Sequence, residues 1–487
     1  MAVKKGMEYT GTVDRTDFPN KGIVYIDGEK VCVKNALPGQ KIKFTIGKVR
    51  NGRAEGNLKE VIEPSPIETA EPLCPHFGQC GGCSYQRIAY RDQLELKSGQ
   101  VKRLLDNAAE GEYEFQGIVP SPTDRAYRNK MEFSFGDSCK YGELTLGLHK
   151  KGSFYDILQI TDCAIVDSDY NTIIKCVVEL AREFGLTYAH KLTHRGYLRH
   201  LLIRRATMTG EILVNLITTS QWTDGIITET EFMGKLRDRL KALNLNGSIV
   251  GILHSVNDDN ADAVKAERTD ILFGKDFLIE ELLGLFFRIS TFSFFQTNSR
   301  GAEVLYSTAR DFIGDTGDKV IFDLYSGTGT IAQVLAPVAK KVIGVEIVAE
   351  AVESARDNTN FNNISNCEFI CGDVLKVLDT IEDKPDLIVL DPPREGIHPK
   401  ALDKIIAYGV DRIVYISCNP VSLARDLGPL QAGGYRLEKA KCVDMFPQTG
   451  HVETVALLKR VNNAKEHIEI TIDAKDYYRI KDSEKRK

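Results

Sequence analysis

The stretch KVIFDLYSGTGTIAQVLA, residues 319–336, most constrains what this chain can fold into. It reads as a buried apolar strand, a turn with glycines at 327 and 329, and a helix. Because glycine lacks a Cβ atom, a ligand can approach the backbone above the carboxyl end of the strand. From about residue 286 onward, strands and helices alternate. This alternation predicts a doubly wound α/β sheet with a ligand site at that edge.

Two later strands of this region end in acidic side chains. Glu346 lies near the end of KKVIGVEI, nineteen residues after Gly327, where such folds place a carboxylate that binds ribose hydroxyls. A third strand, CEFICGD, ends at Asp373. The third glycine of G-x-G-x-x-G is absent, which disfavours a nicotinamide cofactor, and another dinucleotide or flavin fold is the alternative. The pattern DLYSGTGT resembles motif I of the S-adenosylmethionine-dependent methyltransferases.

The next two strands carry candidates for chemistry. DLIVLDPPREGIHP contains Asp391, and an aspartate at a strand end suits a target with an N–H donor, such as uracil N3. RIVYISCNPVSLARD places Cys418 at the carboxyl edge of the sheet, followed by a turn at Asn419-Pro420. A thiolate that adds to carbon 6 of uracil makes carbon 5 nucleophilic toward a methyl donor. An inert, packed cysteine is the alternative.

This chemistry also needs a base that removes the proton from carbon 5. The segment VDMFPQTGHVETVALL offers Glu453 beside a final strand, and we expect Glu453 to take this role. His451 is the rival base, and a solvated surface glutamate is the structural alternative.

Residues 1–62 are expected to form a small OB-like β-barrel. Alternating apolar and polar residues are separated by Asp27-Gly28, Pro38-Gly39 and Asn51-Gly52, which predicts about five short strands. Residues 1–60 hold twelve Lys and Arg against seven Asp and Glu, whereas the whole chain has a net charge of −5. A basic module on an acidic body is typical of an RNA-binding appendage. The phrase ALPGQKIKF resembles the TRAM domain of RNA-modifying enzymes; a generic β domain is the alternative.

A cysteine-rich stretch, CPHFGQCGGCSYQ, contains Cys74, Cys80 and Cys83, and ITDCAIVD adds Cys163 at a distance. The chain has eleven cysteines, an odd number spread over a long chain, and no apolar leader segment. This usage favours a reducing, cytoplasmic location, where clustered thiols indicate metal binding or catalysis. Four thiolates can hold either Zn²⁺ or a [4Fe–4S] cluster, and the spacing leaves both open.

The expected organisation has three domains and a tail. The barrel (1–62) precedes a central α+β domain (73–285), a Rossmann-like methyltransferase domain (286–460) and a charged tail (461–487). A helix at 88–112 could instead pack on the catalytic domain, which would make the central domain discontinuous. No apolar run reaches the length of a membrane span, so we expect no membrane association.

The motifs DPPREG, SCNP and FPQTGHVE, with SFFQTN at 293–298, resemble the RNA (uracil-C5)-methyltransferases. The resemblance covers most of the chain. It implies Cys418 as the nucleophile and Glu453 as the proton acceptor. It also implies contacts to S-adenosylmethionine from four residues: Gln296, Tyr325, Glu346 and Asp391. Thr330 and Asp373 are further candidates for this role.

The family also has branches that differ in their substrate. The rRNA branch carries C-x5-C-G-G-C-x-x-Q with a distant Asp-Cys and binds a [4Fe–4S] cluster, which implies such a cluster on Cys74, Cys80, Cys83 and Cys163. The tRNA branch usually lacks the barrel and these cysteines. We therefore expect a monomer that methylates specific uridines of 23S rRNA. The alternatives are a tRNA uracil-C5 methyltransferase, a methyltransferase of small aromatic rings, and a non-catalytic RNA-binding iron–sulfur protein.

Overall fold

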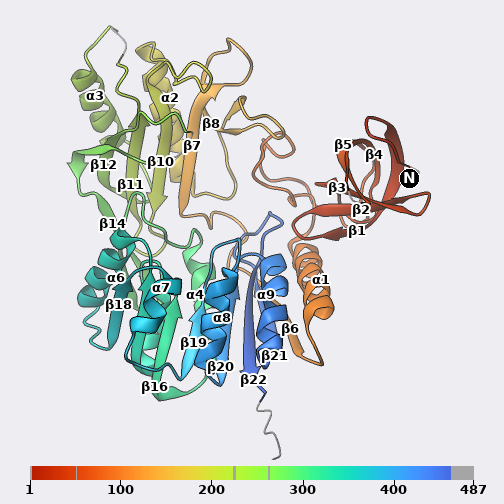
Figure 1. The fold of residues 1–487 in the computed structure, drawn as a ribbon. Coiled ribbons are helices and arrows are strands. Elements are labelled where there is room, and N and C mark those ends of the chain that lie inside the picture. Colours follow the sequence, from red (N-terminus) through yellow and green to blue (C-terminus); the bar gives the residue numbers. More distant parts are fainter. Residues whose placement is uncertain (1–2, 51, 223–225, 262–263, 462–487) are drawn as a thin grey trace, which may run out of the picture.

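The computed structural model describes residues 3–50, 52–222, 226–261 and 264–461. Apart from Val461, the expected charged tail lies outside the described residues. Figure 1 shows a small barrel beside helix α1, a central sheet, and a larger sheet that is covered by helices.

The N-terminal barrel is closed by five strands in the order β1-β2-β3-β5-β4. Their bounds are β1 Glu8–Asp17, β2 Lys21–Ile26, β3 Glu29–Lys34, β4 Lys41–Arg50 and β5 Arg53–Glu63. Alternate residues of β4, namely Ile42, Phe44 and Ile46, fill the interior. Asp27 and Gly28 both have positive φ (47° and 81°), as a tight hairpin turn between β2 and β3 requires. The expected OB-like barrel is confirmed.

The central region is a seven-stranded sheet in the order β13-β12-β11-β10-β7-β8-β9. The strands are β7 Lys130–Asp137, β8 Leu144–His149, β9 Ile157–Gln159, β10 Leu198–Arg205, β11 Glu211–Thr218, β12 Ser248–Val256 and β13 Arg268–Gly274. Helices α2 (Ser168–Glu183) and α3 (Glu229–Lys241) share one apolar core with this sheet. The hairpin β14 (Phe277–Leu282) and β15 (Leu285–Ser290) then leads into the catalytic region.

The catalytic sheet has eight strands in the order β18-β17-β16-β19-β20-β22-β21-β6. The strands are β6 Glu114–Val119, β16 Thr316–Leu324, β17 Ala339–Glu346, β18 Cys367–Cys371, β19 Leu387–Leu390, β20 Arg412–Ser417, β21 Tyr435–Val443 and β22 Glu453–Arg460. The helices are α1 Tyr90–Ala108, α4 Ser299–Ile313, α5 Thr330–Leu335, α6 Ala349–Phe361, α7 Val374–Val377, α8 Pro399–Tyr408 and α9 Pro420–Ala432. Strand order reverses between β16 and β19, which is where such sheets bind ligands.

Residues 90–119, which form helix α1 and strand β6, are part of the catalytic region although they precede the central sheet in sequence. Helix α1 packs on α9, and β6 pairs in parallel with β21, so that Ala440 lies opposite Phe115. The expected continuous range 73–285 therefore contains an element of the catalytic sheet, because the outer edge of β21 offers unpaired backbone groups. The expected boundary at 286 falls within the hairpin β14–β15.

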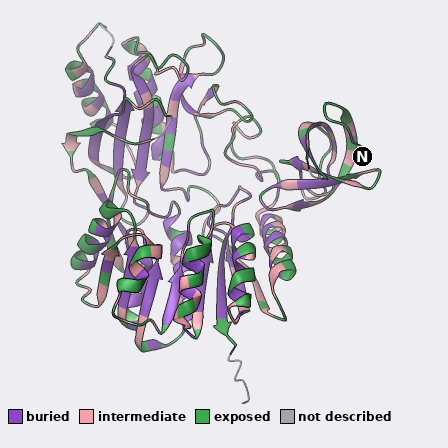
Figure 2. Ribbon diagram, viewed as in Figure 1, coloured by how far each residue is buried: buried purple, intermediate pink, exposed green. Residues whose placement is uncertain are grey.

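Both sheets have buried strands, and the exposed residues concentrate on helices and loops (Figure 2). Among the described residues, no helix is both long enough and apolar enough to span a bilayer.

Candidate active site and cysteine cluster

The glycine turn after β16 meets the acidic end of β17. Tyr325 follows β16 in the left-handed conformation, with φ of 69°. The Gly327 N–H donates to Oε2 of Glu346 at 3.0 Å, and the Val348 N–H donates to Oε1 at 2.9 Å. Glu346 therefore fixes the turn from the next strand, and both residues lie at the carboxyl edge that the spacing predicted.

The two further candidates lie on either side of this turn. Thr330 is the first residue of α5 and is buried. Asp373 caps α7, because its Oδ1 accepts from the Leu375 N–H at 2.9 Å. Sequence reasoning assigned no role to Asp323, which is fully buried in β16. Burial, with a further contribution from Asp391, raises the pKa of Asp323 to about 8.

Gln296 reaches the same edge from the loop before α4. Asn129 holds this loop, since its Nδ2 donates to the Gln296 carbonyl at 2.9 Å and to Ser299 Oγ at 2.8 Å. Behind the loop, burial raises the pKa of Tyr306, and the charges of Asp391 and Glu453 raise it further. A hydrogen bond with Gln296 lowers this pKa. Tyr306 therefore lies where the expected cofactor residue Gln296 and the expected catalytic residues meet.

Cys418 and Glu453 come from neighbouring antiparallel strands. Cys418 directly follows β20, Glu453 begins β22, and Ser417 pairs with Thr454. Burial, together with the charges of Glu453 and Asp391, raises the pKa of Cys418 to about 11. Burial also raises the pKa of Asp391 to about 7 and, with help from Asp391, that of Glu453 to about 8. The structure thus brings one thiol and two acids into a single interacting group.

Arg394 is a functional candidate that sequence reasoning quoted in DPPREG but did not use. Its positive charge lowers the pKa of both Cys418 and Glu453, against the effect of burial. The loop that carries Arg394 is fixed because Asn419 Nδ2 donates to the Arg394 carbonyl at 2.9 Å. The position of Arg394 could have indicated this role. It lies four residues after Leu390, the last residue of strand β19, which ends at the candidate site.

His451, the rival base, lies in a half-buried aromatic setting. Its ring meets the edges of Phe18 and Phe446 at centroid distances of 6.5 Å and 6.3 Å. Burial, and then the charges of Arg394 and other cations, lower its pKa. Phe18 belongs to the barrel, so the barrel lies against the catalytic region at this point.

The structure brings Cys74, Cys80, Cys83 and Cys163 together from two segments of the chain. Burial, with the charges of the other three thiols, raises the pKa of Cys83 to about 12. The Cys74 thiol donates to the Asp162 carbonyl at 3.7 Å, and Cys80 Sγ accepts from the Gly82 N–H at 3.4 Å. All eleven cysteines are free thiols. Within the four described ranges, no group of three or more His, Cys, Asp or Glu side chains is arranged to hold a metal ion.

Comparisons with known proteins relate the chain to RNA methyltransferases. An uncharacterized RNA methyltransferase of Clostridium tetani is 49% identical over 460 residues, which cover 94% of this chain and 99% of the relative. One of Caldanaerobacter subterraneus is 47% identical over 456 residues, with coverage of 94% and 99%. Among solved structures, the Pyrococcus abyssi tRNA (uracil-54, C5)-methyltransferase in complex with S-adenosyl-L-homocysteine is 27% identical. Its TM-score is 0.70, over 93% of this chain and 100% of that chain.

A family model, described as tRNA (Uracil-5-)-methyltransferase, matches residues 89–461, which is most of the chain. The match includes every expected catalytic and S-adenosylmethionine-binding residue, and it excludes the barrel and Cys74, Cys80 and Cys83. The chain therefore belongs to the tRNA (uracil-5-)-methyltransferase family and is an S-adenosylmethionine-dependent RNA (uracil-C5)-methyltransferase.

Proposed function

We propose that this enzyme methylates carbon 5 of specific uridines in 23S rRNA through a covalent adduct between Cys418 and carbon 6 of the uracil. The observation that carries the chemistry is the interacting group of Cys418, Glu453 and Asp391 at the carboxyl edge of the sheet. A thiol that lies beside two acids with raised pKa values has proton acceptors at hand, which nucleophilic catalysis requires.

S-adenosylmethionine, when bound, supplies a methyl group on a positively charged sulfur. We assign Gln296, Tyr325, Glu346 and Asp391 to hold it, with Thr330 and Asp373 as further candidates. The geometry fits, because Glu346 and the glycine turn form one hydrogen-bonded unit at the point where the strand order reverses. Carboxylates also suit a cationic ligand, whose charge lowers the pKa of the acids around it.

The reaction steps follow from the side chains. Cys418 Sγ, after its proton has passed to a neighbouring carboxylate, forms a bond to carbon 6 of uracil, and the electron pair of the C5–C6 double bond moves onto the ring carbonyl. Carbon 5 of this enolate would then take the methyl group: the new C5–CH₃ bond forms as the bond between the methyl group and the donor sulfur breaks, and the sulfur keeps that electron pair and leaves as a neutral thioether. The Glu453 carboxylate removes the remaining proton from carbon 5, the double bond re-forms, and the C6–S bond breaks to release Cys418. Arg394 favours the thiolate and the carboxylate in these steps, since it lowers both pKa values.

The same proposal assigns Cys74, Cys80, Cys83 and Cys163 as ligands of a [4Fe–4S] cluster. Four free thiols that lie close enough for their charges to interact are a suitable set of ligands for such a cluster. These cysteines would hold the group through their thiolate sulfurs, and a single Zn²⁺ ion is the alternative that the same four ligands could bind. Bound iron would contribute to folding and would ionise the thiols whose pKa burial raises.

The rRNA assignment rests on the barrel and the cysteine cluster. The barrel adds basic charge beside the site, where Phe18 meets His451. RNA of this kind is read mainly through unpaired bases, with the target uridine turned out of its stack. tRNA is the second candidate. The Pyrococcus structure, which is named for uracil 54 of tRNA, aligns with 93% of this chain. An alignment of this extent cannot leave out both the barrel and the cysteine region.

The test is nucleoside mass spectrometry after incubation with labelled S-adenosylmethionine and, separately, unmodified 23S rRNA or unmodified tRNA. We expect labelled 5-methyluridine in rRNA alone. Label in tRNA alone would overturn the rRNA assignment and leave the chemistry of Cys418 and Glu453 in place. Label at another nucleoside, or none with either RNA, would contradict the proposed chemistry.

A further inference from the structure

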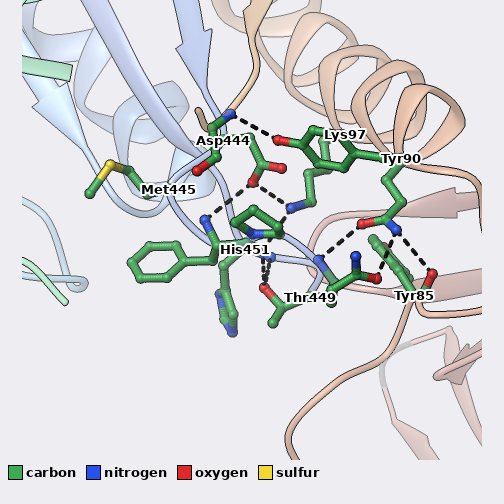
Figure 3. Close-up of polar contacts among 12 residues, drawn as sticks. Tyr85, Tyr90, Lys97, Asp444, Met445, Thr449 and His451 are labelled. Atoms are coloured by element: carbon green, nitrogen blue, oxygen red, sulfur yellow. Dashed lines mark hydrogen bonds and ion pairs between the residues drawn. The ribbon is translucent and has the colours of Figure 1, made fainter. Parts of the chain in front are cut away.

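The hairpin loop 444–451, followed by Val452, connects β21 to β22, so Glu453 comes almost directly after it. Val443, the last residue of β21, pairs with Glu453, the first residue of β22, so a shift of the loop moves the proposed base directly. Figure 3 shows the polar contacts that surround this loop.

Four consecutive carbonyls of the loop accept hydrogen bonds from four different parts of the chain. The donors are Asn298 for Met445 (3.0 Å), Lys97 for Phe446 (3.0 Å), Tyr127 for Pro447 (2.9 Å), and the N–H groups of Ser84 and Tyr85 for Gln448 (2.8 and 3.0 Å). Of these donors, Lys97 lies on α1 and Asn298 directly precedes α4, both in the catalytic region, whereas Ser84 and Tyr85 precede α1 and Tyr127 lies shortly before β7 of the central sheet. The loop is therefore held by segments that lie far apart in the sequence.

Lys97 makes the most unusual of these contacts. Its side chain on α1 is fully buried, and its ammonium group lies 2.7 Å from Oδ1 of Asp444, which is also fully buried. The same Asp444 oxygen accepts from the Phe446 N–H at 3.2 Å. A buried ion pair adds little net stability, because removing two charges from water costs about as much as their attraction returns, so its presence calls for another explanation.

A second link lies one turn earlier on α1. Gln93 and Gln448 exchange two hydrogen bonds: Gln93 Nε2 donates to Gln448 Oε1 at 3.0 Å, and the Gln448 N–H donates to Gln93 Oε1 at 3.0 Å. Gln448 has a positive φ of 67°, a conformation that non-glycine residues adopt only when their surroundings enforce it. Both links place the loop in one register against α1.

We propose that Lys97, with Asp444 as its partner, is a positioning residue for Glu453: it fixes the 444–451 loop so that the base reaches carbon 5 of the methylated adduct. The inference rests on the proposed role of Glu453. Lys97 itself touches neither Cys418 nor any expected cofactor residue by the contacts described above. Its loss should therefore slow proton removal more than it weakens cofactor binding.

The test compares two variants. Lys97→Met leaves Asp444 charged and unpaired, whereas the double variant Lys97→Met/Asp444→Asn removes both charges and keeps similar side-chain volumes, so it avoids an unpaired buried charge. In both variants we expect turnover to fall by about 10- to 100-fold, since small displacements of a catalytic group have effects of this size. We expect the KM for S-adenosylmethionine to stay within about twofold and the methylated covalent RNA adduct to accumulate, as for Glu453→Gln.

The matched control is Gln431→Leu. Gln431 is a buried polar residue that also docks α1, by accepting from the Glu110 N–H and donating to the Ala108 carbonyl, but it does not touch the loop. It should show no adduct accumulation. If the double variant folds and shows no more adduct than Gln431→Leu, or if both Lys97 variants fail to fold, Lys97 has only a structural role. If Glu453→Gln itself accumulates no adduct, the proposed base is wrong rather than the positioning inference alone.

Discussion

The pKa values of Cys418, at the catalytic edge, and of Cys83, in the cysteine cluster, are both raised, and the surroundings of the two thiols differ. At the catalytic edge, burial and the charges of Glu453 and Asp391 raise the pKa of Cys418, whereas the charge of Arg394 lowers it. In the cysteine cluster, burial raises the pKa of Cys83, and the charges of three other cysteines add to it, with only a hydrogen bond from Gln86 opposing them. A thiol that must ionise briefly therefore has charged neighbours of both signs. The clustered thiols have no side-chain cation among these influences, and a bound metal would supply one.

Removing the Cys418 thiol tests the difference between the two sites most directly. Cys418→Ala should lower turnover by about 10³-fold or more and abolish the covalent RNA adduct, because no other group can form the bond to carbon 6. Gel-shift under denaturing conditions detects the adduct. Cys139→Ala, which removes an exposed cysteine of the central region, is the control and should behave like the wild type. Normal methylation by Cys418→Ala would exclude covalent catalysis.

Removing the proposed base should have the next largest effect. Glu453→Gln should lower turnover by about 10²- to 10³-fold and trap a methylated adduct, because the carbon-5 proton then has no acceptor. Mass spectrometry of the cross-linked species identifies the methyl group. Glu438→Gln, on β21 and paired with Lys459 at the surface, serves as the control. A wild-type rate for Glu453→Gln would move the role of base to His451.

The pH dependence sharpens the role of the cation. In the proposed mechanism the carboxylate form of Glu453 acts as the base, and burial raises the pKa of Glu453 to about 8, so kcat/KM should rise as pH increases from 6 through 8. Arg394→Gln removes a cation that lowers this pKa, so the rise should move to higher pH and activity at pH 7 should fall by about tenfold for a shift of about one unit. Arg91→Gln, at an exposed site on α1, should leave the profile unchanged. An unshifted profile in Arg394→Gln would show that the arginine acts in another way.

The cysteine cluster should be the least important for the chemistry itself. Cys83→Ala in anaerobically purified protein should lose the visible absorption and the bound iron, about four atoms per chain in the wild type, because one ligand of the cluster is gone. The same variant should still form the Cys418 adduct with RNA. Zinc rather than iron in the wild type, measured by elemental analysis, would contradict the cluster assignment. Complete loss of the adduct in a folded Cys83→Ala protein would contradict the separation of the two thiol groups.

Local patterns in the sequence were sufficient for much of the site. The alternation of strands and helices and the glycine turn predicted that Glu346 and Cys418 lie at one sheet edge, because both signals are set within a few residues. Tyr325 was expected only from the family resemblance. The barrel followed from its turn dipeptides in the same way. Strand pairings between segments that are distant in the chain could not be predicted from the sequence. Strand β6 joins the sheet only through β21, more than 300 residues later in the chain, and nothing in its sequence specifies that partner.

Lys97 shows most clearly why the rest could not be predicted. A lysine within a polar helix is expected to be solvated, and its burial depends on Asp444, which is 347 residues away. Arg394 was visible in its motif, but its effect on two pKa values arises from distances that only the fold determines. When the role of a residue depends on a charge that is distant in the sequence, local sequence patterns cannot predict that role.

The way the 444–451 loop is held shows how much of the chain this loop needs. Its supports come from the stretch after the cysteines, from α1 and from the central region, whereas the loop itself lies near the end of the chain. Residues 286–460 alone would therefore keep most of their sheet but lack most of the donors that hold this loop. All of these donors precede the loop in the chain, so synthesis from the N-terminus makes every one of them before the loop that they hold.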